Sequence, residues 1–167
     1  MALSRERGFR VLADLATPEI GAYLRRRLYP LAASELDDLV AEVLLVAWRR
    51  YDDIPSDAQI PWLIGVARNV LRNAVRKQQR TSILEARWRR PITDSSAEDN
   101  FIADESVRVA LTALTADDRE VLLLHAWDGC NAEQIGIILG ISSNAAAVRL
   151  SRVKGRFQQS LSEASLS

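Results

Sequence analysis

The stretch Asn131–Lys154, NAEQIGIILGISSNAAAVRLSRVK, decides the fold class of this chain. A helix of about two turns is predicted up to Leu139, and Gly140 can then take the left-handed conformation that ends a helix. Ser142 is a favourable N-cap for a second helix, which begins with small residues and ends with basic ones. This order predicts a helix-turn-helix. The pattern alone leaves two interpretations open, a DNA-reading motif and a plain helix pair with a basic outer face.

The second helix of this motif is expected to run from Ser142 to about Gln159. Val148 and Val153 are expected to face the core. The side chains expected to point outward are the basic ones, Arg149, Arg152, Lys154 and Arg156. The start of the helix has free N–H groups and the positive end of the helix dipole, which suit a phosphate.

Helical spacing continues on the N-terminal side of the motif, back to Glu105. A short amphipathic helix is predicted from its apolar positions, which are Val107, Ala110, Leu111 and Leu114. Thr115 and Asp118 have the spacing of a capping box and open a further helix. Asn131 and Gln134 provide another N-cap signal.

The first half of the chain predicts a helical bundle over about residues 19–80. Pro30 interrupts the first helical stretch. Ser34 and Asp37 fit a capping box, after which a helix is expected to run to about Tyr51. The buried stripe of that helix is expected to be Leu36, Leu39, Val40, Val43, Leu44 and Ala47.

A loop is predicted over Asp52–Pro61, which contains two prolines and no periodicity. One long helix should follow, from Trp62 to about Arg80. Its apolar face is expected to consist of Trp62, Leu63, Val66, Val70, Leu71 and Val75. The other side carries Arg68, Asn69, Arg72, Asn73, Arg76 and Lys77.

The composition changes beyond Arg80, where a basic WRRP segment precedes the polar, acidic ITDSSAEDN. This segment is expected to be a flexible linker, and Trp88 within it, if exposed, would suggest a contact with a partner. The chain is therefore expected to be all-α, with two small helical domains joined by a flexible linker and a helix-turn-helix in the C-terminal one. The expected limits are 1–80 for the first domain, 81–104 for the linker and 105–167 for the second domain.

Net charge is zero, but the charges are segregated along the chain. From Arg68 to Arg90 there are eight basic residues against one acidic residue, whereas residues 91–125 contain eight acidic residues against two basic ones. Such blocks create local electrostatic fields that the net charge does not reveal. The alternative interpretation is that each block is only the solvated face of a helix. The N-terminus does not resemble a signal peptide, and no stretch is apolar enough for membrane insertion. A cytoplasmic protein is expected.

The chemistry-bearing residues are few. Cys130 is the only cysteine, which excludes an internal disulfide and a cysteine-built metal site. His125 is the only histidine and is expected to be structural. The sequence also lacks a glycine-rich phosphate loop and a convergent carboxylate pair. No catalytic residue, metal site or cofactor is therefore expected, and the chain is not expected to be an enzyme.

Four stretches resemble bacterial sigma factors. Asp37–Val43 (DDLVAEV) with Ala47–Arg50 (AWRR) resembles the family's DLVQE-x-F-x-RAW, and Trp62–Asn69 (WLIGVARN) resembles WL-x-x-IARN. Leu114 with Arg119–Leu124 (REVLLL) resembles LP-x-x-x-REVLLL. The helix-turn-helix is similar to EEIAEILGIS…VKSRLHRARKRL at Glu133, Ile135, Leu139, Gly140, Ile141, Ser142, Arg149, Leu150 and Arg152. Their order and the chain length resemble the extracytoplasmic-function group, the smallest sigma factors, which keep only regions 2 and 4.

This resemblance implies roles for particular residues. Region 2 would bind core RNA polymerase through acidic side chains, and the matching positions are Asp37, Asp38 and Glu42. It would also capture a flipped base with the predicted loop and read the minus-ten promoter element with Arg68, Asn69, Arg72, Asn73, Arg76 and Lys77. Region 4 would read the minus-thirty-five element in promoter DNA with Ser143, Asn144, Ala147, Arg149, Arg152 and Lys154. An anti-sigma factor is a further partner that the resemblance implies.

Two departures and several alternatives stay open. Gln59 and Ile60 stand where the family has a glycine and an aromatic residue, and Ala145–Ala147 replaces a stretch that often reads Thr-Val-Lys. The main alternative is a helix-turn-helix transcriptional regulator that does not bind core polymerase. An enzyme and a helical adaptor that binds only protein are weaker alternatives.

Overall fold

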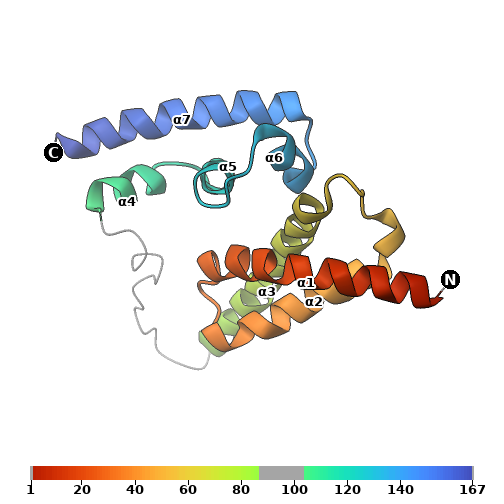
Figure 1. Cartoon of the computed structure of the whole chain (residues 1–167). Helices are drawn as coiled ribbons and strands as arrows, with labels where there is room; N and C mark the ends of the chain where they lie inside the picture. Colours follow the sequence, from red (N-terminus) through yellow and green to blue (C-terminus); the bar gives the residue numbers. More distant parts are fainter. Residues whose placement is uncertain (1, 87–103, 167) are drawn as a thin grey trace. The chain divides into compact units, whose positions relative to one another are not determined.

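The computed structural model describes residues 2–86 and 104–166, and this part of the chain contains helices and turns but no strand. The chain divides into two compact helical units, each considered by itself (Figure 1). The expected all-α fold with two helical units and a C-terminal helix-turn-helix is confirmed. Residues 87–103 of the predicted linker, with Trp88, lie outside the described residues. The domain limits at 80 and 105 remain predictions.

The first helix, α1 (Ala2–Arg26), begins well before residue 19, where the sequence predicted the start of the bundle. It continues through Pro18 because apolar residues on both sides of the proline lie on one buried face. Those residues are Leu12, Ala16, Ile20, Tyr23 and Leu24. The N-terminal third of unit 1 is therefore part of the bundle rather than a tail.

The second helix begins differently from the prediction. A short 3-10 helix, η1 (Ala33–Glu35), precedes α2 (Leu36–Arg49). Ser34 caps nothing; instead the Ala32 N–H donates to Glu35 Oε2 at 3.2 Å. The predicted Ser34–Asp37 capping box is thus wrong, because the tighter 3-10 turn places Ser34 inside the turn. Of the predicted stripe, Leu39, Val43 and Ala47 are buried, while Leu36, Val40 and Leu44 are half-buried.

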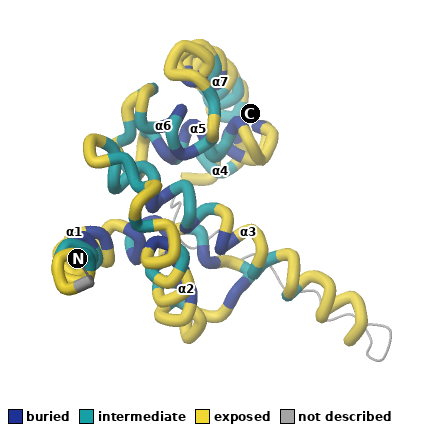
Figure 2. The backbone as a smooth tube through the Cα atoms, turned by 90° about the vertical axis from the view of Figure 1, so that its right-hand side faces the viewer, coloured by how far each residue is buried: buried dark blue, intermediate teal, exposed yellow. Residues whose placement is uncertain are grey.

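The third helix is longer than predicted at both ends. A 3-10 turn, η2 (Tyr51–Asp53), follows α2, and α3 (Gln59–Ala86) starts within the predicted loop. Pro61 is tolerated because it lies in the first turn, where backbone N–H groups have no partner inside the helix. Beyond Arg80 the helix continues with exposed side chains, and Figure 2 shows this end of α3 as almost entirely exposed.

Unit 1 is held together by apolar contacts among α1, α2 and α3, each of which packs against the other two. Leu39, Val43 and Ala47 of α2 form a stripe at a spacing of four residues. The buried residues of α3 recur at three- and four-residue spacing and are Leu63, Ile64, Ala67, Val70 and Leu71. Tyr23 of α1 is the bulkiest fully buried side chain of the unit.

Unit 2 consists of α4 (Glu105–Thr112), α5 (Ala116–Ala126), α6 (Ala132–Leu139) and α7 (Ser143–Ser165). The long helix α7 packs against each of the other three and ends beyond the predicted Gln159. The central core cluster joins three of the helices and their turns through Leu111, Leu114, Leu122 and Val153. Among the residues that the structure describes, no helix combines the length and the apolar character that a membrane span needs.

Candidate nucleic-acid interface

Local hydrogen bonds that the sequence signalled define both ends of α6 and the start of α7. The Gln134 N–H donates to Asn131 Oδ1 and the Asn131 N–H donates to Gln134 Oε1, both at 2.9 Å, which completes the capping box of α6. Gly140 ends α6 at φ 69°, in the left-handed region. The Ala145 N–H donates to Ser142 Oγ at 3.0 Å and so caps α7. The left-handed Gly140 and the Ser142 cap therefore end α6 and start α7 within three residues.

Gly136 is a further requirement of this turn that the sequence reading missed. A Cβ atom at this position would lie 2.8 Å from the backbone oxygen of Ile141, closer than such atoms approach. The Ile141 N–H in turn donates to the Gly136 carbonyl at 2.9 Å. The sequence signal for this requirement is an isolated glycine within a predicted helix, which costs helix stability and so indicates close packing.

The exposed face of α7 carries most of the residues proposed for DNA contact. Ala146, Leu150 and Val153 are the buried residues of this helix. The exposed candidates are Ser143, Asn144, Ala147, Arg152 and Lys154. Val148 is 43% exposed, so its predicted place in the core is wrong. Each residue of a helix is rotated by about 100° from the one before it. Val148 is two residues from both Ala146 and Leu150, so it lies on the opposite side of α7 from these residues and Val153.

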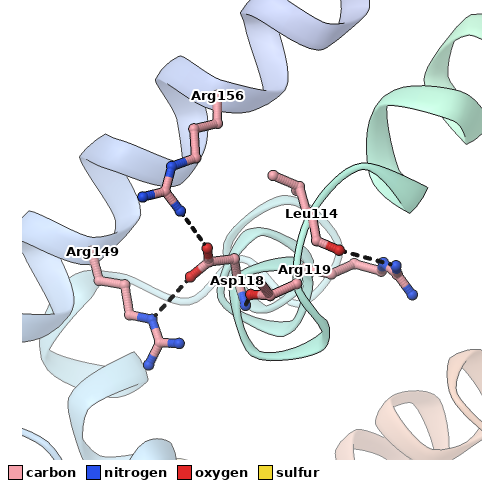
Figure 3. A network of polar contacts seen from close by, with 6 residues as sticks. Leu114, Asp118, Arg119, Arg149 and Arg156 are labelled. Atoms are coloured by element: carbon pink, nitrogen blue, oxygen red, sulfur yellow. Dashed lines mark hydrogen bonds and ion pairs between the residues drawn. The ribbon is translucent and has the colours of Figure 1, made fainter.

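Two arginines of α7 do not simply point into solvent as predicted. Arg149 Nε donates to Asp118 Oδ1 at 3.2 Å, and Arg156 Nη1 donates to Asp118 Oδ2 at 2.7 Å (Figure 3). Asp118 lies in the first turn of α5 and is buried. The sequence assigned Asp118 only to a capping box. Its N–H does donate to Thr115 Oγ1 at 3.2 Å, but its carboxylate binds α7.

Polar contacts also join α4 to α5. Arg119 donates to the Leu111 carbonyl at 2.9 Å through Nε and to the Leu114 carbonyl at 3.3 Å through Nη2, and Figure 3 shows it pointing away from Asp118. These bonds satisfy carbonyls at the end of α4. Asp118 and Arg119, which are neighbours in α5, therefore contact α7 and the end of α4, respectively.

At the start of α4, a hydrogen bond from Arg108 and its positive charge lower the pKa of the exposed Glu105 carboxyl.

In unit 1, the basic and amide side chains of α3 form a continuous exposed stripe. The residues proposed for minus-ten recognition that are exposed are Asn69, Arg72, Asn73, Arg76 and Lys77. Arg68 is half-buried. The stripe lies on the side of α3 away from its buried residues, which leaves most of its cations accessible to a phosphate backbone.

The acidic residues of α2 lie beside exposed apolar side chains. Asp37, Asp38 and Glu42 are all exposed. Leu45 and Trp48, further along the same helix, are 47% and 37% exposed. A surface that combines carboxylates with accessible apolar area fits a basic helical partner, since charges speed and orient the encounter while apolar burial provides affinity.

An aromatic corner at the end of α2, which the sequence did not predict, joins α2 to the N-terminal part of α1. The ring centroids of Phe9 and Trp48 lie 5.1 Å apart, edge to face, and those of Phe9 and Tyr51 6.0 Å apart. Arg5 donates to the Trp48 carbonyl at 2.9 Å and its guanidinium lies 5.1 Å from the Trp48 ring centroid. A Cβ atom on Gly8 would collide with the Tyr51 hydroxyl, so a larger residue at this position would displace the Tyr51 side chain.

The single histidine and the single cysteine lie together near the end of α5. His125 Nδ1 is 3.0 Å from the Cys130 carbonyl oxygen, and Gly129 between them has φ 66°. His125 therefore has a structural contact, in agreement with the prediction. Among the described residues, no group of three or more histidine, cysteine, aspartate or glutamate side chains could hold a metal ion.

Fold and surface together define a class of protein, a helical nucleic-acid-binding factor with one polar or basic helix exposed on each of two units. The family Sigma-70 region 2 matches residues 17–81, and the family Sigma-70, region 4, matches residues 104–157. The chain belongs to the extracytoplasmic-function group of the sigma-70 family and contains regions 2 and 4. It is an RNA polymerase sigma factor that directs promoter-specific transcription initiation, and such factors are not enzymes.

Individual relatives agree with this assignment. The chain is 33% identical over 153 residues to the RNA polymerase sigma factor CarQ of Myxococcus xanthus, covering 89% of this chain and 86% of the relative. It is 28% identical over 126 residues to the ECF RNA polymerase sigma factor EcfG of Rhodopseudomonas palustris, covering 74% and 70%. The sigma factor RpoE, solved with the anti-sigma factor NepR from Bartonella quintana, is similar in fold. Its TM-score is 0.62 at 23% identity, covering 93% of this chain and 98% of that chain.

These similarities exclude the main alternative, a helix-turn-helix transcriptional regulator that does not bind core polymerase. The first half of such a regulator would not match a sigma-factor region, whereas region 2 matches residues 17–81. The region 2 match begins after Phe9 and the other N-terminal residues of the aromatic corner. The α1 side of that corner thus lies outside the matched segment, whereas Trp48 and Tyr51 lie within it.

Proposed function

We propose that unit 1 joins this sigma factor to core RNA polymerase and reads the minus-ten element, while unit 2 reads the minus-thirty-five element. The observation that carries the proposal is that α3 and α7 each bury one apolar face and expose a polar or basic one. A promoter with two separate elements needs two such surfaces, and two units can bind them independently. Because core polymerase and promoters are cytoplasmic, we infer that the protein acts in the cytoplasm.

The exposed surface of α2 is the proposed contact with core polymerase. Its carboxylates are Asp37, Asp38 and Glu42, and Leu45 and Trp48 add apolar area. The partner would be the clamp helices of the largest polymerase subunit, where basic side chains would pair with the carboxylates. The double variant Asp38→Ala with Leu45→Ala should therefore weaken co-purification with core polymerase. Glu19→Ala on α1, also exposed, is the matched control and should leave it unchanged.

The exposed stripe of α3 is the proposed minus-ten reader. Asn69 and Asn73 can form two hydrogen bonds with a base edge, while Arg72, Arg76 and Lys77 can bind phosphates or bases. Arg68, half-buried, would act from the edge of the stripe. The segment between η2 and α3 would receive the flipped base, next to Trp62, whose ring lies 5.2 Å from the Arg50 guanidinium.

The exposed face of α7 is the proposed minus-thirty-five reader. Ser143, Asn144 and Ala147 lie on its first turns and would approach base edges in the major groove. Arg152 and Lys154, both exposed, would add base or phosphate contacts. Arg149 belongs to the sequence-predicted set but is engaged by Asp118.

Run-off transcription with purified core polymerase on fragments of the host genome tests the whole proposal. The full chain should start transcription at a limited set of sites, and those sites should share two sequence elements. Transcription equal to that of core polymerase alone on every fragment would overturn it. The same assay gives the promoter sequence, which the amino-acid sequence does not determine.

An anti-sigma factor is the remaining proposed partner. Support comes from the similar fold of RpoE, which was solved in complex with the anti-sigma factor NepR. Exposed apolar and charged surface on α2 would suit such a partner while the sigma factor is idle. A protein that co-purifies from the host at constant ratio and abolishes run-off transcription when added back would support the proposal. Full activity at that ratio would contradict it.

A further inference from the structure

The carboxylate of Asp118 holds α7 at two points along its length. Asp118 is 7% exposed and is the only buried charged residue in the described part of the chain. Its two oxygens accept from Arg149 at 3.2 Å and from Arg156 at 2.7 Å. Arg149 and Arg156 are seven residues apart, which is about two helical turns or roughly 10 Å along the axis. Figure 3 shows both arginines reaching from α7 toward the same carboxylate.

This double contact restricts motions that the apolar contacts of α7 leave comparatively free. Ala146, Leu150 and Val153 keep α7 at a fixed distance from its neighbours, but apolar contacts have little directionality. Charge-assisted hydrogen bonds to two oxygens of one carboxylate require a particular rotation and a particular axial position. A change in either would displace every side chain on the exposed face of α7 relative to the rest of the unit.

We propose that Asp118 is a positioning residue for promoter recognition, and that Arg149 and Arg156 orient α7 rather than contact DNA. The proposal rests on the proposed function of α7 as the minus-thirty-five reader and reassigns Arg149 within it. The reading of the major groove then depends on the remaining exposed candidates of α7, which are Ser143, Asn144, Ala147, Arg152 and Lys154. Specificity depends on a residue of α5 that touches no base.

A competing arrangement predicts the opposite change in DNA affinity for the variant Asp118→Asn. If Arg149 is a DNA contact that Asp118 merely restrains, removing the Asp118 charge frees Arg149 and strengthens DNA binding. If Asp118 positions α7, removing the charge weakens binding. Asp118→Asn keeps the size of the side chain and therefore distinguishes the two arrangements.

The experiment uses holoenzyme assembled from core polymerase and the full chain. The probe is a DNA duplex selected by wild-type holoenzyme from a pool with a randomised minus-thirty-five region. Asp118→Asn, Arg149→Gln and the double variant are compared by affinity over a series of salt concentrations. Asp117→Asn is the matched control, because it removes the same charge from the next residue, which is exposed. Thermal melting of each full chain checks that unit 2 is folded.

The positioning role predicts that Arg149→Gln lowers affinity for the selected duplex about tenfold, in line with the loss of one charged hydrogen bond. Asp118→Asn removes the charge that both arginines bind and should lower affinity at least as much. The double variant should be no weaker than Asp118→Asn, because that variant already removes the charged contact with Arg149. The slope of log affinity against log salt concentration should equal that of wild type, since no phosphate contact is lost. Asp117→Asn should bind as wild type does.

Other outcomes overturn the proposal. Tighter binding by Asp118→Asn shows restraint of a DNA contact, and a salt slope reduced by about 0.9 in Arg149→Gln shows a phosphate contact. Equal behaviour of Asp118→Asn and Asp117→Asn shows a general charge effect. If Asp118→Asn unfolds, the salt slope of Arg149→Gln alone decides between the two arrangements. Failure of the proposed function is separate, because wild-type holoenzyme would then select no duplex.

Discussion

The helices proposed to read the promoter are held in their units by different kinds of contact. In unit 1, α3 is fixed by apolar residues such as Leu63 and Val70, and most of its cations are exposed. In unit 2, α7 is fixed by apolar residues and also by Asp118, which engages Arg149 and Arg156. The difference teaches that a basic residue on a predicted DNA-facing helix can also serve its own unit, by pairing with a buried carboxylate of a neighbouring helix.

Packing explains why the units differ. The buried face of α3 has five apolar residues in contact with two long helices, α1 and α2. The buried residues of α7 are Ala146, Leu150 and Val153, and α4 to α6 are short. At about 25 cal/mol for each Å² of buried apolar surface, a small alanine contributes little. The two directional ion pairs of Asp118, at the start of α5, add to the apolar contacts of α7.

The largest expected effect tests the apolar character of unit 1. Leu63→Ala removes a fully buried side chain and should destabilise unit 1 by about 3 kcal/mol, the typical size for a core leucine. Hydrogen exchange measured by mass spectrometry should show the loss of protection in α1 to α3. Leu45→Ala, on the exposed side of α2, should change stability little. Equal effects of the two variants would contradict the assigned core.

The next effect concerns the turn of unit 2. Gly136→Ala places a methyl group 2.8 Å from the Ile141 carbonyl oxygen and should destabilise unit 2 by about 1–3 kcal/mol. Gly155→Ala is the matched control, because nothing lies within 4 Å of its Cβ position. It should stabilise α7 by about 0.5–1 kcal/mol through helix propensity. Thermal unfolding of both variants checks the sign of each change, and a stabilised Gly136→Ala would show that the turn is looser than described.

A smaller effect is expected at the aromatic corner. Phe9→Ala removes edge-to-face contacts with Trp48 and Tyr51 and should destabilise unit 1 by about 1 kcal/mol. Val11→Ala, at a 57% exposed position of the same helix, should be close to neutral. Tryptophan fluorescence should also shift in Phe9→Ala because the Trp48 ring gains contact with water. An unchanged spectrum with unchanged stability would mean that this part of α1 does not support α2.

The smallest effect on stability should come with a clear effect on DNA binding. Arg72→Ala removes an exposed cation and should leave the unfolding free energy within about 0.5 kcal/mol of wild type. Holoenzyme affinity for promoter DNA should fall, and the salt slope should decrease by about 0.9 if one phosphate contact is lost. Arg156→Ala should show the reverse pattern, with lower stability and an unchanged slope. Identical patterns for the two variants would remove the distinction between the units.

The residues proposed for function were predicted more fully in unit 1 than in unit 2. Helical spacing separated Leu63 and Val70 from Arg72 and Arg76 because α3 follows the simple rule of one apolar and one polar side. The same rule counted Arg149 among outward cations and placed Val148 in the core. The helix period alone could not resolve positions at the edge of the buried face of α7, where contacts with α5 decide.

Helix ends show the same division between local and distant causes. The caps at Asn131 and Ser142 and the left-handed Gly140 were predicted, because each depends on residues at most three positions away. The start of α2 was not, because a 3-10 turn replaced the expected cap at Ser34. The start of α1 was also missed, since its first turns depend on contacts of Phe9 and Arg5 with Trp48, about forty positions further along the chain.

The sequence by itself determined the helical class, the helix-turn-helix, its caps and the membership in the sigma family. These follow from short-range periodicity, from local hydrogen bonds and from motifs whose order along the chain is directly visible. Only the tertiary structure decided that Asp118 binds Arg149 and Arg156, that Gly136 lies against Ile141 and that Phe9 packs on Trp48. Most of these contacts join residues far apart in the sequence, and no local pattern records which side chains the packing of helices brings together.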